Sequence, residues 1–362
     1  MLNAIISKLY YLLNIILPKF KNKTVFCCFP DFEDMLRGML PHINGRIIVL
    51  VTNTDVIRPN WLDEKIEVVK KKSISGLWHL LTARTIYFTH GLFFFFRLIS
   101  SDRQLVVNLW HGMPLKNIGF LDGKKHVPPS HKLLCTSLMF QRIMAEAFRM
   151  QLDDVLITGL PRNDVLLRRV ENKELIKLNK KYKKIHVWLP TYRKSYLGDI
   201  RNDGNASNVF GFADFDAKGL NQLLKSNNEF LLVKPHPMAM YTDSAESLSN
   251  IKIINEQWLS GVGITLYELL AATDTLWTDF SSVFVDYAIT KKTILFVIPD
   301  MKLYKESRGL TFDIETIKLP GLVVENEKDL ISAVANQGDW GNETQCSDFN
   351  AISPFNFSAL SK

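Results

Sequence analysis

The chain has few cysteines and no long apolar run. Of its 362 residues only 4 are cysteine, and Cys27, Cys28, Cys135 and Cys346 form neither a C-x-x-C pair nor a zinc-binding spacing. This usage favours a reduced, cytoplasmic chain. The longest apolar stretch, 2–17, is shorter than the roughly 20 residues that a membrane-spanning helix needs, and Lys8 interrupts it.

Signatures of several ligand classes are also missing. Gly261-Val262-Gly263 lacks the third glycine and the preceding strand of a dinucleotide fingerprint. Asp214-Phe215-Asp216 has D-x-D spacing but leads into a predicted helix, so we expect no metal there. No nucleic-acid motif or aromatic-basic interleaving accompanies the formal charge of +7. The basic balance therefore indicates a different anionic partner, either a phospholipid surface or a phosphorylated substrate.

What is present is an ordinary globular composition, with 47% hydrophobic and 22% charged residues. The length corresponds to about two domains. The N-terminal segment is unusual, because Asn3, Ser7, Tyr10 and Asn14 form a polar stripe at helical spacing and 18–23 adds basic charge without acid. This pattern predicts an amphipathic helix on an anionic membrane face. The alternative is a first helix that packs on the N-terminal domain.

Short β-rich runs alternate with helical stretches along the rest of the chain. Runs of Val, Ile and Phe without strict alternation are typical of parallel strands buried on both faces. The expected strands are 24–29, 46–51, 65–69, 85–89, 105–110, 132–136, 155–158, 185–189, 230–234, 251–254, 274–277, 293–298 and 321–324. Between them we expect helices, including one at 137–150 that Ser137 caps and one at 265–272 that begins with a Thr265–Glu268 capping box.

This pattern predicts an α/β protein with two doubly wound halves. The expected division is a surface helix at 1–23, an N-terminal α/β domain at 24–167, a basic boundary helix or linker at 168–184, a C-terminal α/β domain at 185–340 and a tail at 341–362.

A histidine follows one of the predicted strands at once. The run 105–110 ends in Trp110-His111-Gly112, and Pro114 and Lys116 follow before a helix can begin. Ligands of open α/β sheets bind beyond the carboxyl ends of the strands, so His111 is a candidate site residue. An isolated histidine in this position is otherwise a structural core residue, and His90-Gly91 after 85–89 has the same two interpretations.

Four polar segments in the second half also lie at or shortly after strand ends, and the first three can recognise an anion. The fourth is a polar loop, whose residues fit surface salt bridges equally well. Arg193 offers a planar fork of donors, and His236 is held between two prolines. Ser281 and Ser282 precede a predicted helix, whose first N–H groups can bind a pyrophosphate, although plain helix capping by Asp279 or Ser281 fits as well. The segments are Pro190-Thr191-Tyr192-Arg193, Lys234-Pro235-His236-Pro237, Thr278-Asp279-Phe280-Ser281-Ser282 and Asp300…Tyr304…Arg308-Gly309.

Together with Trp110–Lys116 and Gly159-Leu160-Pro161-Arg162-Asn163-Asp164, these segments resemble, in order, the signature of the CDP-glycerol glycerophosphotransferases. This family includes teichoic-acid primases and polymerases and their capsule and O-antigen relatives. The similarity covers about 105–330. The sequence departs from the family pattern at Met113, which is usually Thr, and at Tyr192, which is usually Trp.

The resemblance implies a GT-B-like fold, in which two Rossmann-like domains face one another across a cleft. The acceptor would bind to the N-terminal domain and a CDP-alcohol to the C-terminal one. It implies attack of an acceptor hydroxyl on the β-phosphate of CDP-glycerol, release of CMP, and no cofactor or metal. His111 is then the general base, and the pyrophosphate is held by His236, which we also count as catalytic, and by Arg193, Ser281 and Ser282. Further expected substrate contacts are Asp279, Lys116, Arg162, Tyr304 and Arg308.

The resemblance leaves the donor alcohol (glycerol or ribitol), the lipid-linked or polymer acceptor and the oligomeric state open. The implied location is the cytoplasmic face of the cell membrane. Two other functions stay open: a GT-B glycosyltransferase or nucleotide-sugar epimerase, and a non-catalytic membrane-bound scaffold in polysaccharide assembly.

Overall fold

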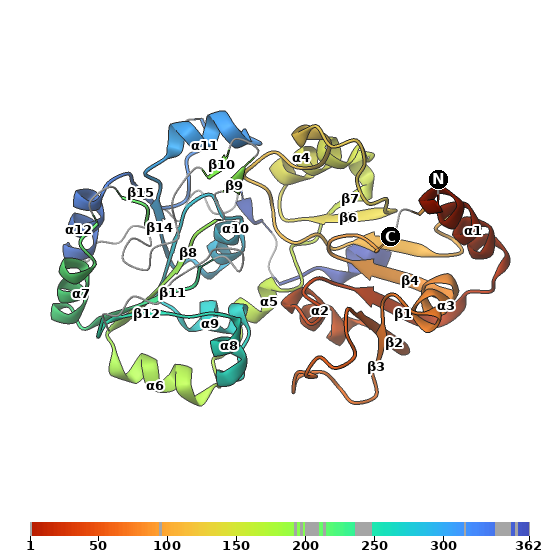
Figure 1. Ribbon diagram of the computed structural model, residues 1–362, viewed down its shortest axis with the longest axis horizontal. Helices are drawn as coiled ribbons and strands as arrows, with labels where there is room; N and C mark the ends of the chain where they lie inside the picture. Colours follow the sequence, from red (N-terminus) through yellow and green to blue (C-terminus); the bar gives the residue numbers. More distant parts are fainter. Residues whose placement is uncertain are drawn as a thin grey trace. The chain divides into compact units, whose positions relative to one another are not determined.

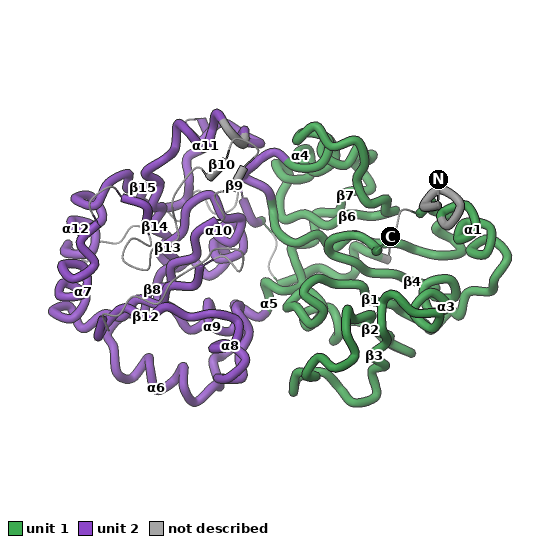
Figure 2. The backbone as a smooth tube through the Cα atoms, viewed as in Figure 1, with its two compact units in different colours: residues 1–113, 118–164, 351–362 green, residues 114–117, 165–350 purple. Residues whose placement is uncertain are grey.

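The computed structural model describes residues 2–361 except for 94–95, 192–193, 196–197, 200–209, 213–214, 236–247, 315, 337–348 and 352–353. The chain divides into two compact units (Figures 1 and 2). Unit 1 comprises residues 1–113, 118–164 and 351–362, and unit 2 comprises residues 114–117 and 165–350. The chain therefore changes unit four times.

Unit 1 contains a seven-stranded sheet in the order β3-β2-β1-β4-β5-β6-β7, with all neighbouring strands parallel. The strands are β1 (Phe20–Cys27), β2 (Arg46–Val51), β3 (Glu67–Lys70), β4 (Ala83–Phe88), β5 (Leu105–Asn108), β6 (Lys132–Cys135) and β7 (Val155–Ile157). The helices are α1 (Leu2–Ile16), α2 (Asp34–Met39), α3 (Ile74–Thr82) and α4 (Leu138–Phe148), with short 3-10 turns at η1 (Leu40–His42), η2 (Gly119–Asp122), η3 (Leu152–Asp154) and η6 (Phe357–Ser361). The direction of winding reverses between β1 and β4, which makes this pair the topological switch point.

Unit 2 repeats this plan with a six-stranded parallel sheet in the order β12-β11-β8-β13-β14-β15. Its strands are β8 (Lys184–Leu189), β11 (Glu229–Val233), β12 (Ile251–Ile253), β13 (Thr275–Thr278), β14 (Thr293–Val297) and β15 (Leu322–Val324), and a small ribbon pairs β9 (Lys194–Ser195) with β10 (Gly198–Asp199). The helices are α6 (Lys173–Lys181), α7 (Ala217–Ser226), α8 (Glu256–Val262), α9 (Leu266–Ala272), α10 (Val283–Tyr287), α11 (Met301–Arg308) and α12 (Glu327–Ala335). Helix α10 continues into the 3-10 turn η4 (Ala288–Thr290). The chain passes from unit 1 to unit 2 between residues 164 and 165, inside the short helix α5 (Asn163–Leu166). The switch point lies between β8 and β13.

All of the strands expected from the sequence are confirmed, with ends that move by a few residues. The predicted helix starts are confirmed as well. The Ser137 hydroxyl accepts a hydrogen bond from the Phe140 N–H, and Thr265 and Glu268 form a reciprocal capping box. These local signals are reliable because a cap satisfies N–H groups that have no partner inside the helix.

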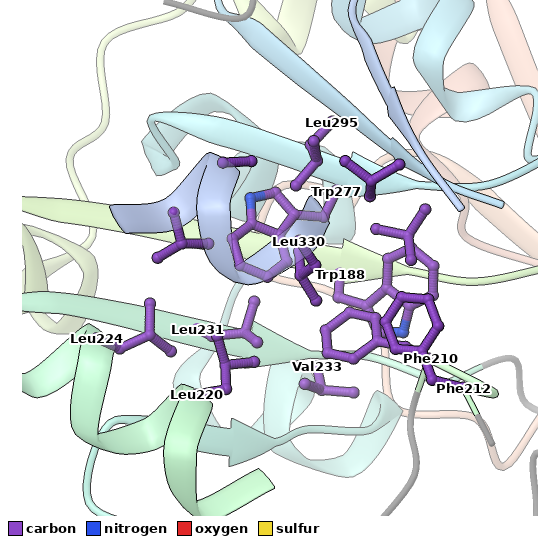
Figure 3. Packing of buried hydrophobic residues seen from close by; sticks show 14 residues of the cluster. Trp188, Phe210, Phe212, Leu220, Leu224, Leu231, Val233, Trp277, Leu295 and Leu330 are labelled. Carbon is purple, nitrogen blue, oxygen red and sulfur yellow. The ribbon is translucent and has the colours of Figure 1, made fainter. Parts of the chain in front are cut away.

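The core of unit 2 lies between its sheet and helices α7 and α12 (Figure 3). Trp188 on β8 and Trp277 on β13 are fully buried, and Phe210 packs against both rings with centroid distances of 4.9 and 6.0 Å. Leu220 and Leu224 of α7 are on the same side of that helix, because they are four residues apart. Burying side chains of this size stabilises the fold by about 1.5–3 kcal/mol each.

Helix α1 packs on unit 1, and two residues of the polar stripe expected on it, Tyr10 and Asn14, do not face solvent. Tyr10 and Asn14 are buried, and the Asn14 amide donates to the Gln104 Oε1 at 3.0 Å. Lys19 in turn donates to the Asn14 Oδ1 at 2.7 Å, so the buried amide is satisfied on both sides. The exposed side of α1 carries large apolar side chains besides Lys8, with Leu9 and Leu12 each 56% and Ile16 75% exposed. Within the described ranges, no helix combines the length and hydropathy that crossing a membrane requires.

Residues 351–362 return to unit 1 and pack on the ends of its strands. The N–H of Ala351 donates to the Thr136 carbonyl oxygen and that of Asn356 to the Thr158 carbonyl oxygen, both at 2.9 Å. The Phe357 ring stacks on His42 with a centroid distance of 5.2 Å and an interplanar angle of 13°. Unit 1 is therefore assembled from sequence segments that are far apart in the chain.

We expect Gly38→Ala to destabilise unit 1. Gly38 in α2 lies against the Gly159–Asp164 turn, and a Cβ there would be 2.2 Å from the Pro161 carbonyl oxygen. Because that atom belongs to the backbone, the helix must shift, at a cost of about 1–3 kcal/mol. Urea unfolding should show a lower midpoint. Gly261→Ala is the matched control, since nothing lies within 4 Å of a Cβ at Gly261 in α8; an equal loss in both variants would contradict the steric explanation.

Candidate active site

The site predicted around His111 lies at the carboxyl end of the unit 1 sheet, close to its switch point. Phe29 follows β1, Thr89 and His90 follow β4, and Trp110 and His111 follow β5. Since β1, β4 and β5 are neighbours in the sheet, these segments emerge side by side. His90 lies next to His111 because β4 and β5 are neighbours in the sheet, and this strand order could not be predicted from the sequence.

The two imidazoles form a parallel stack. The rings of His90 and His111 have a centroid distance of 3.8 Å and an interplanar angle of 8°, and Trp110 lies on His111 at 3.9 Å. The His111 Nδ1 is 3.1 Å from the Thr89 carbonyl oxygen. A carbonyl oxygen only accepts, so Nδ1 of His111 carries a proton, and in the neutral ring the lone pair is on Nε2.

The turn that carries His111 has a strained backbone. Trp110 has φ 58°, in the left-handed region that non-glycine residues rarely adopt, and Gly112 follows with φ 134°. The Asn108 Oδ1 accepts a hydrogen bond from the Trp110 N–H at 2.9 Å and so stabilises the turn. Strain of this kind persists only where the surrounding structure holds it, and it is concentrated at functional sites.

A carboxyl group that the sequence motifs do not include is influenced by Thr89, the residue before His90. Burial raises the pKa of Glu33 to about 7, against the opposing effects of the Thr89 hydroxyl and the Arg162 guanidinium. The Glu33 Oε1 is buried and has no hydrogen-bond partner among the described residues. Burial, with the positive charges of Arg162 and Lys71, lowers the pKa of His90 to about 4. Perturbed groups at a strand edge are typical of functional sites.

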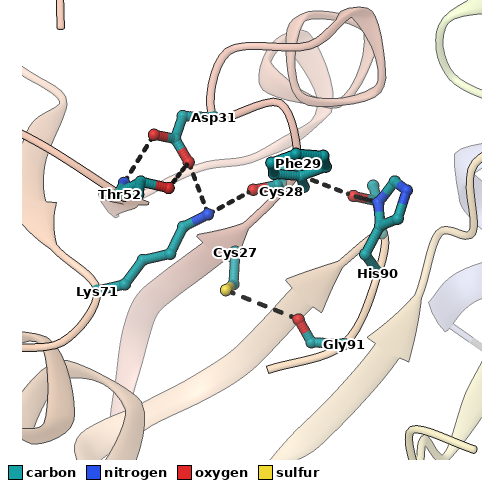
Figure 4. A network of polar contacts seen from close by, with 9 residues as sticks. Cys27, Cys28, Phe29, Asp31, Thr52, Lys71, His90 and Gly91 are labelled. Carbon is teal, nitrogen blue, oxygen red and sulfur yellow. Dashed lines mark hydrogen bonds and ion pairs between the residues drawn. The ribbon is translucent and has the colours of Figure 1, made fainter. Parts of the chain in front are cut away.

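An ion pair holds the neighbouring loops together (Figure 4). The Lys71 ammonium after β3 lies 2.6 Å from the Asp31 Oδ1 and donates to the Cys28 carbonyl oxygen at 2.8 Å. Asp31 also accepts hydrogen bonds from the N–H and the hydroxyl of Thr52 after β2. The pair is only about one tenth exposed, so it fixes the ends of β1, β2 and β3 relative to one another.

None of the described cysteines is a candidate nucleophile. Cys27, Cys28 and Cys135 are free and buried, and burial raises the pKa of all three thiols, to about 11 for Cys27 and about 12 for Cys135. Among the described residues, no group of three or more His, Cys, Asp or Glu side chains is arranged to hold a metal ion.

Unit 2 has a polar contact at its own switch point. The Asp279 carboxylate after β13 is fully buried and accepts a hydrogen bond from the Thr191 N–H after β8, at 2.9 Å for Oδ1 and 3.1 Å for Oδ2. Asp279 therefore anchors the segment that leads into Arg193. Ser281 and Ser282 come next, and the Ser282 side chain makes no capping hydrogen bond to α10 although Ser282 is the N-cap residue.

The last predicted motif of unit 2 packs on the segment that follows His111. The Tyr304 ring is buried and stacks on Phe280 with a centroid distance of 3.7 Å. Lys116 pairs with Leu310 in an antiparallel bridge, and the Thr311 hydroxyl donates to the Pro114 carbonyl oxygen at 2.7 Å. Gly309 has φ +64°, and a Cβ there would be 2.4 Å from the Asn117 Nδ2.

The predicted site residues are thus distributed over both units. Arg162 is buried in unit 1, where its charge acts on Glu33 and His90. The Lys116 side chain is exposed. Arg193 and His236 lie outside the described residues, as does the side chain of Arg308. Sequence reasoning missed Glu33, Thr89 and Lys71, because none of them belongs to a recognisable motif. The available signal was their position at or shortly after the ends of predicted strands.

Two parallel Rossmann-like sheets, each with polar groups gathered at its switch point, define a class of two-unit α/β proteins that bind ligands at strand ends. The family model of the CDP-glycerol:poly(glycerophosphate) glycerophosphotransferases matches residues 9–353. The chain belongs to this family.

Its relatives include the teichoic acid glycerol-phosphate transferase of Staphylococcus aureus, 29% identical over 274 residues, which are 68% of this chain and 65% of the relative. A teichoic acid ribitol-phosphate polymerase of the same species, TarL, is 27% identical over 68% of this chain and 44% of its own length. A solved structure of the wall teichoic acid polymerase TagF soaked with CDPG has a TM-score of 0.70 at 21% identity and covers 98% of this chain and 90% of that one. This likeness supports the fold.

Proposed function

We propose that this chain transfers glycerol phosphate from CDP-glycerol to a hydroxyl group of a saccharide or polymer acceptor, with release of CMP, in the synthesis of a cell-surface polymer. The observation that carries the proposal is the match to the glycerophosphotransferase family over residues 9–353. The chain spans 65% of the length of the S. aureus transferase and 74% of a Bacillus spizizenii poly(glycerol phosphate) polymerase. A ribitol phosphate donor is the second candidate, because the relatives include ribitol-phosphate polymerases.

In this reaction His111 removes the proton of the acceptor hydroxyl. The hydrogen bond from its Nδ1 to the Thr89 carbonyl oxygen orients the ring and leaves the lone pair on Nε2 for that task. Unit 1 therefore binds the acceptor in this proposal.

Unit 2 binds the CDP-alcohol. Arg193, His236, Ser281 and Ser282 hold the pyrophosphate, Asp279 anchors the segment before Arg193, and Lys116, Tyr304 and Arg308 complete or support the site. Arg162 is a further substrate contact and belongs to unit 1. Phosphoryl transfer depends mainly on positioning and on neutralisation of charge, which protein cations can supply without a metal. The two binding sites face each other across a GT-B cleft in this proposal.

The function is tested by incubating the purified chain with CDP-glycerol, CDP-ribitol or UDP-sugars and candidate acceptors, with and without EDTA. We expect CMP and a glycerol phosphodiester, in amounts that EDTA does not reduce. Release of UDP instead would favour a glycosyltransferase or epimerase. No product with any donor would favour the non-catalytic scaffold, and loss of activity with EDTA would contradict the metal-free mechanism.

We also propose that α1 binds the inner face of the cell membrane, where a lipid-linked acceptor would be found. Leu9, Leu12 and Ile16 lie on one side of the helix and are more than half exposed, and exposed Lys8 and Lys21 lie near them in the sequence. An apolar face with neighbouring lysines suits an anionic lipid surface, because the helix buries its apolar side chains among the acyl chains while the lysines contact phosphates.

We expect the double change Leu12→Glu and Ile16→Glu to abolish co-sedimentation with vesicles that contain 30 mol% phosphatidylglycerol, while CDP-glycerol binding stays unchanged. Leu152→Glu is the control, since this side chain is 45% exposed in η3, away from α1 in the sequence. Retained vesicle binding in the double variant would contradict the proposal. If the wild type forms a dimer in sedimentation velocity and the double variant does not, the exposed face of α1 binds a second copy of the chain instead of a membrane.

A further inference from the structure

The stacked imidazoles of His90 and His111 present their Nε2 atoms on the same side. Nδ1 of His90 lies 3.1 Å from the Thr89 Oγ1, and Nδ1 of His111 lies 3.1 Å from the carbonyl oxygen of the same threonine. The ring centroids are 3.8 Å apart, with an interplanar angle of 8°. Because both Nδ1 atoms are directed at one residue, both Nε2 atoms lie on the side of the stack that faces away from it. Two ring nitrogens are thus placed next to each other.

Contacts within unit 1 hold this pair of nitrogens in position. The Thr89 Oγ1 accepts a hydrogen bond from the Phe29 N–H at 3.1 Å, and Thr89 is fully buried. Trp110 lies on His111 with a centroid distance of 3.9 Å, and the Phe29 ring meets His90 edge-on at 5.5 Å (Figure 4). His90 itself is exposed, so a ligand can reach its ring. A pair that is fixed before binding favours a ligand whose groups have the matching spacing.

The two nitrogens fit two adjacent hydroxyl groups. The proton on Nδ1 of His111 leaves a lone pair on Nε2, which in the proposed function receives the proton of the reacting hydroxyl. Desolvation and the charges of Arg162 and Lys71 lower the pKa of His90 to about 4, so its ring is neutral at pH 7.5. A neutral imidazole bonds a hydroxyl in either tautomer, since a hydroxyl both donates and accepts. Hydroxyls on neighbouring carbons are close enough together to reach two stacked rings at once.

We propose that His90 binds the hydroxyl next to the reacting one, so that unit 1 selects acceptors that carry a vicinal diol. Nε2 of His90 holds this neighbouring hydroxyl while Nε2 of His111 takes the proton of the hydroxyl that attacks. The inference rests on the proposed function and names the chemical class of its acceptor. A glycerol that carries phosphate on a terminal carbon ends in such a diol, and many sugars contain one.

The test compares 3-methoxypropane-1,2-diol with 3-methoxypropan-1-ol, which keeps the terminal hydroxyl and lacks the adjacent one. Each probe is titrated into the chain carrying ¹³C- and ¹⁵N-labelled histidine, and binding is followed by NMR through the ring signals of His111, which are assigned by their loss in His111→Ala. We expect the wild type to bind the diol about 2–10-fold more tightly, the usual net effect of one hydrogen bond. His90→Phe keeps a ring against His111 but has no nitrogen, so it should bind both probes equally.

His126→Phe is the matched control, because it changes an exposed histidine of the same unit, and it should keep the preference for the diol. Methyl β-glucopyranoside is the third probe. Weaker binding of this sugar to His90→Phe than to the wild type would assign the diol to a sugar, and equal binding would assign it to a glycerol end.

Equal affinity of the wild type for the first two probes would overturn the inference, as would a preference for the diol that persists in folded His90→Phe. Transfer assays with CDP-glycerol separate this result from the proposed function. If glycerol phosphate is transferred but the diol is not preferred, the inference fails and the proposed function stands. If the preference depends on His90 but no donor is used, the proposed function fails and the diol site stands.

Discussion

Replacing His111 by alanine should lower kcat by about 10²–10⁴-fold while the chain still binds CDP-glycerol. This is the usual contribution of a positioned general base. The expectation rests on the hydrogen bond from Nδ1 of His111 to the Thr89 carbonyl oxygen, which orients the ring with its basic nitrogen away from the backbone. Because the removed group acts on the acceptor hydroxyl, the donor affinity should not change.

Transfer of radiolabelled glycerol phosphate measures the first quantity, and calorimetric titration with CDP-glycerol measures the second. His126→Ala is the matched control, because it removes an exposed histidine of the same unit. Loss of affinity and of turnover in equal proportion would show that His111 binds the donor, and the assignment as the base would then be abandoned.

Removing the Asp279 carboxylate should abolish measurable binding of CDP-glycerol. Asp279→Ala leaves the half-buried Thr191 N–H without its acceptor, which costs about 1–3 kcal/mol. Thr191, two residues before Arg193 in the sequence, then loses its anchor after β13. Since Arg193 is proposed to hold the pyrophosphate, we expect the variant to lose affinity for CDP-glycerol as well as stability.

Asp274→Ala separates these two effects. The Asp274 carboxylate accepts a hydrogen bond from the Ile185 N–H at 2.7 Å, at the opposite end of the same strand β8. This variant should lose stability in urea unfolding and keep its affinity for CDP-glycerol. Equal affinities in the Asp274 and Asp279 variants would refute the role of Asp279 in donor binding.

The strands and the helix starts could be predicted because their signals are local. A buried run such as 46–51 or a capping residue such as Ser137 depends on neighbours a few residues away. The orientation of α1 could not be predicted in the same way. Helical spacing puts Tyr10 and Asn14 on one face, but only the distant Gln104 shows that this face is buried.

The motifs around His111 and Asp279 were visible in the sequence, and their partners were not. His90 and Thr89 join His111 because β4 lies beside β5, and Thr191 meets Asp279 because β8 lies beside β13. Glu33 follows β1 in the sequence but reaches Thr89 only through the sheet order. The sequence motifs thus identify the residues His111 and Asp279, whereas the strand order determines which residues contact them.

The return of residues 351–362 to unit 1 affects how the chain is made. Unit 1 begins at the N-terminus, but the segment that covers the ends of β6 and β7 is translated after the whole of 165–350. Synthesis of that stretch takes on the order of 10–40 s at the usual rate of elongation. During this time the Thr136 and Thr158 carbonyl oxygens and the His42 ring lack their native partners. Unit 1 is thus completed only after unit 2 has been synthesised, and a chaperone that shields this edge during translation would raise the yield of folded protein.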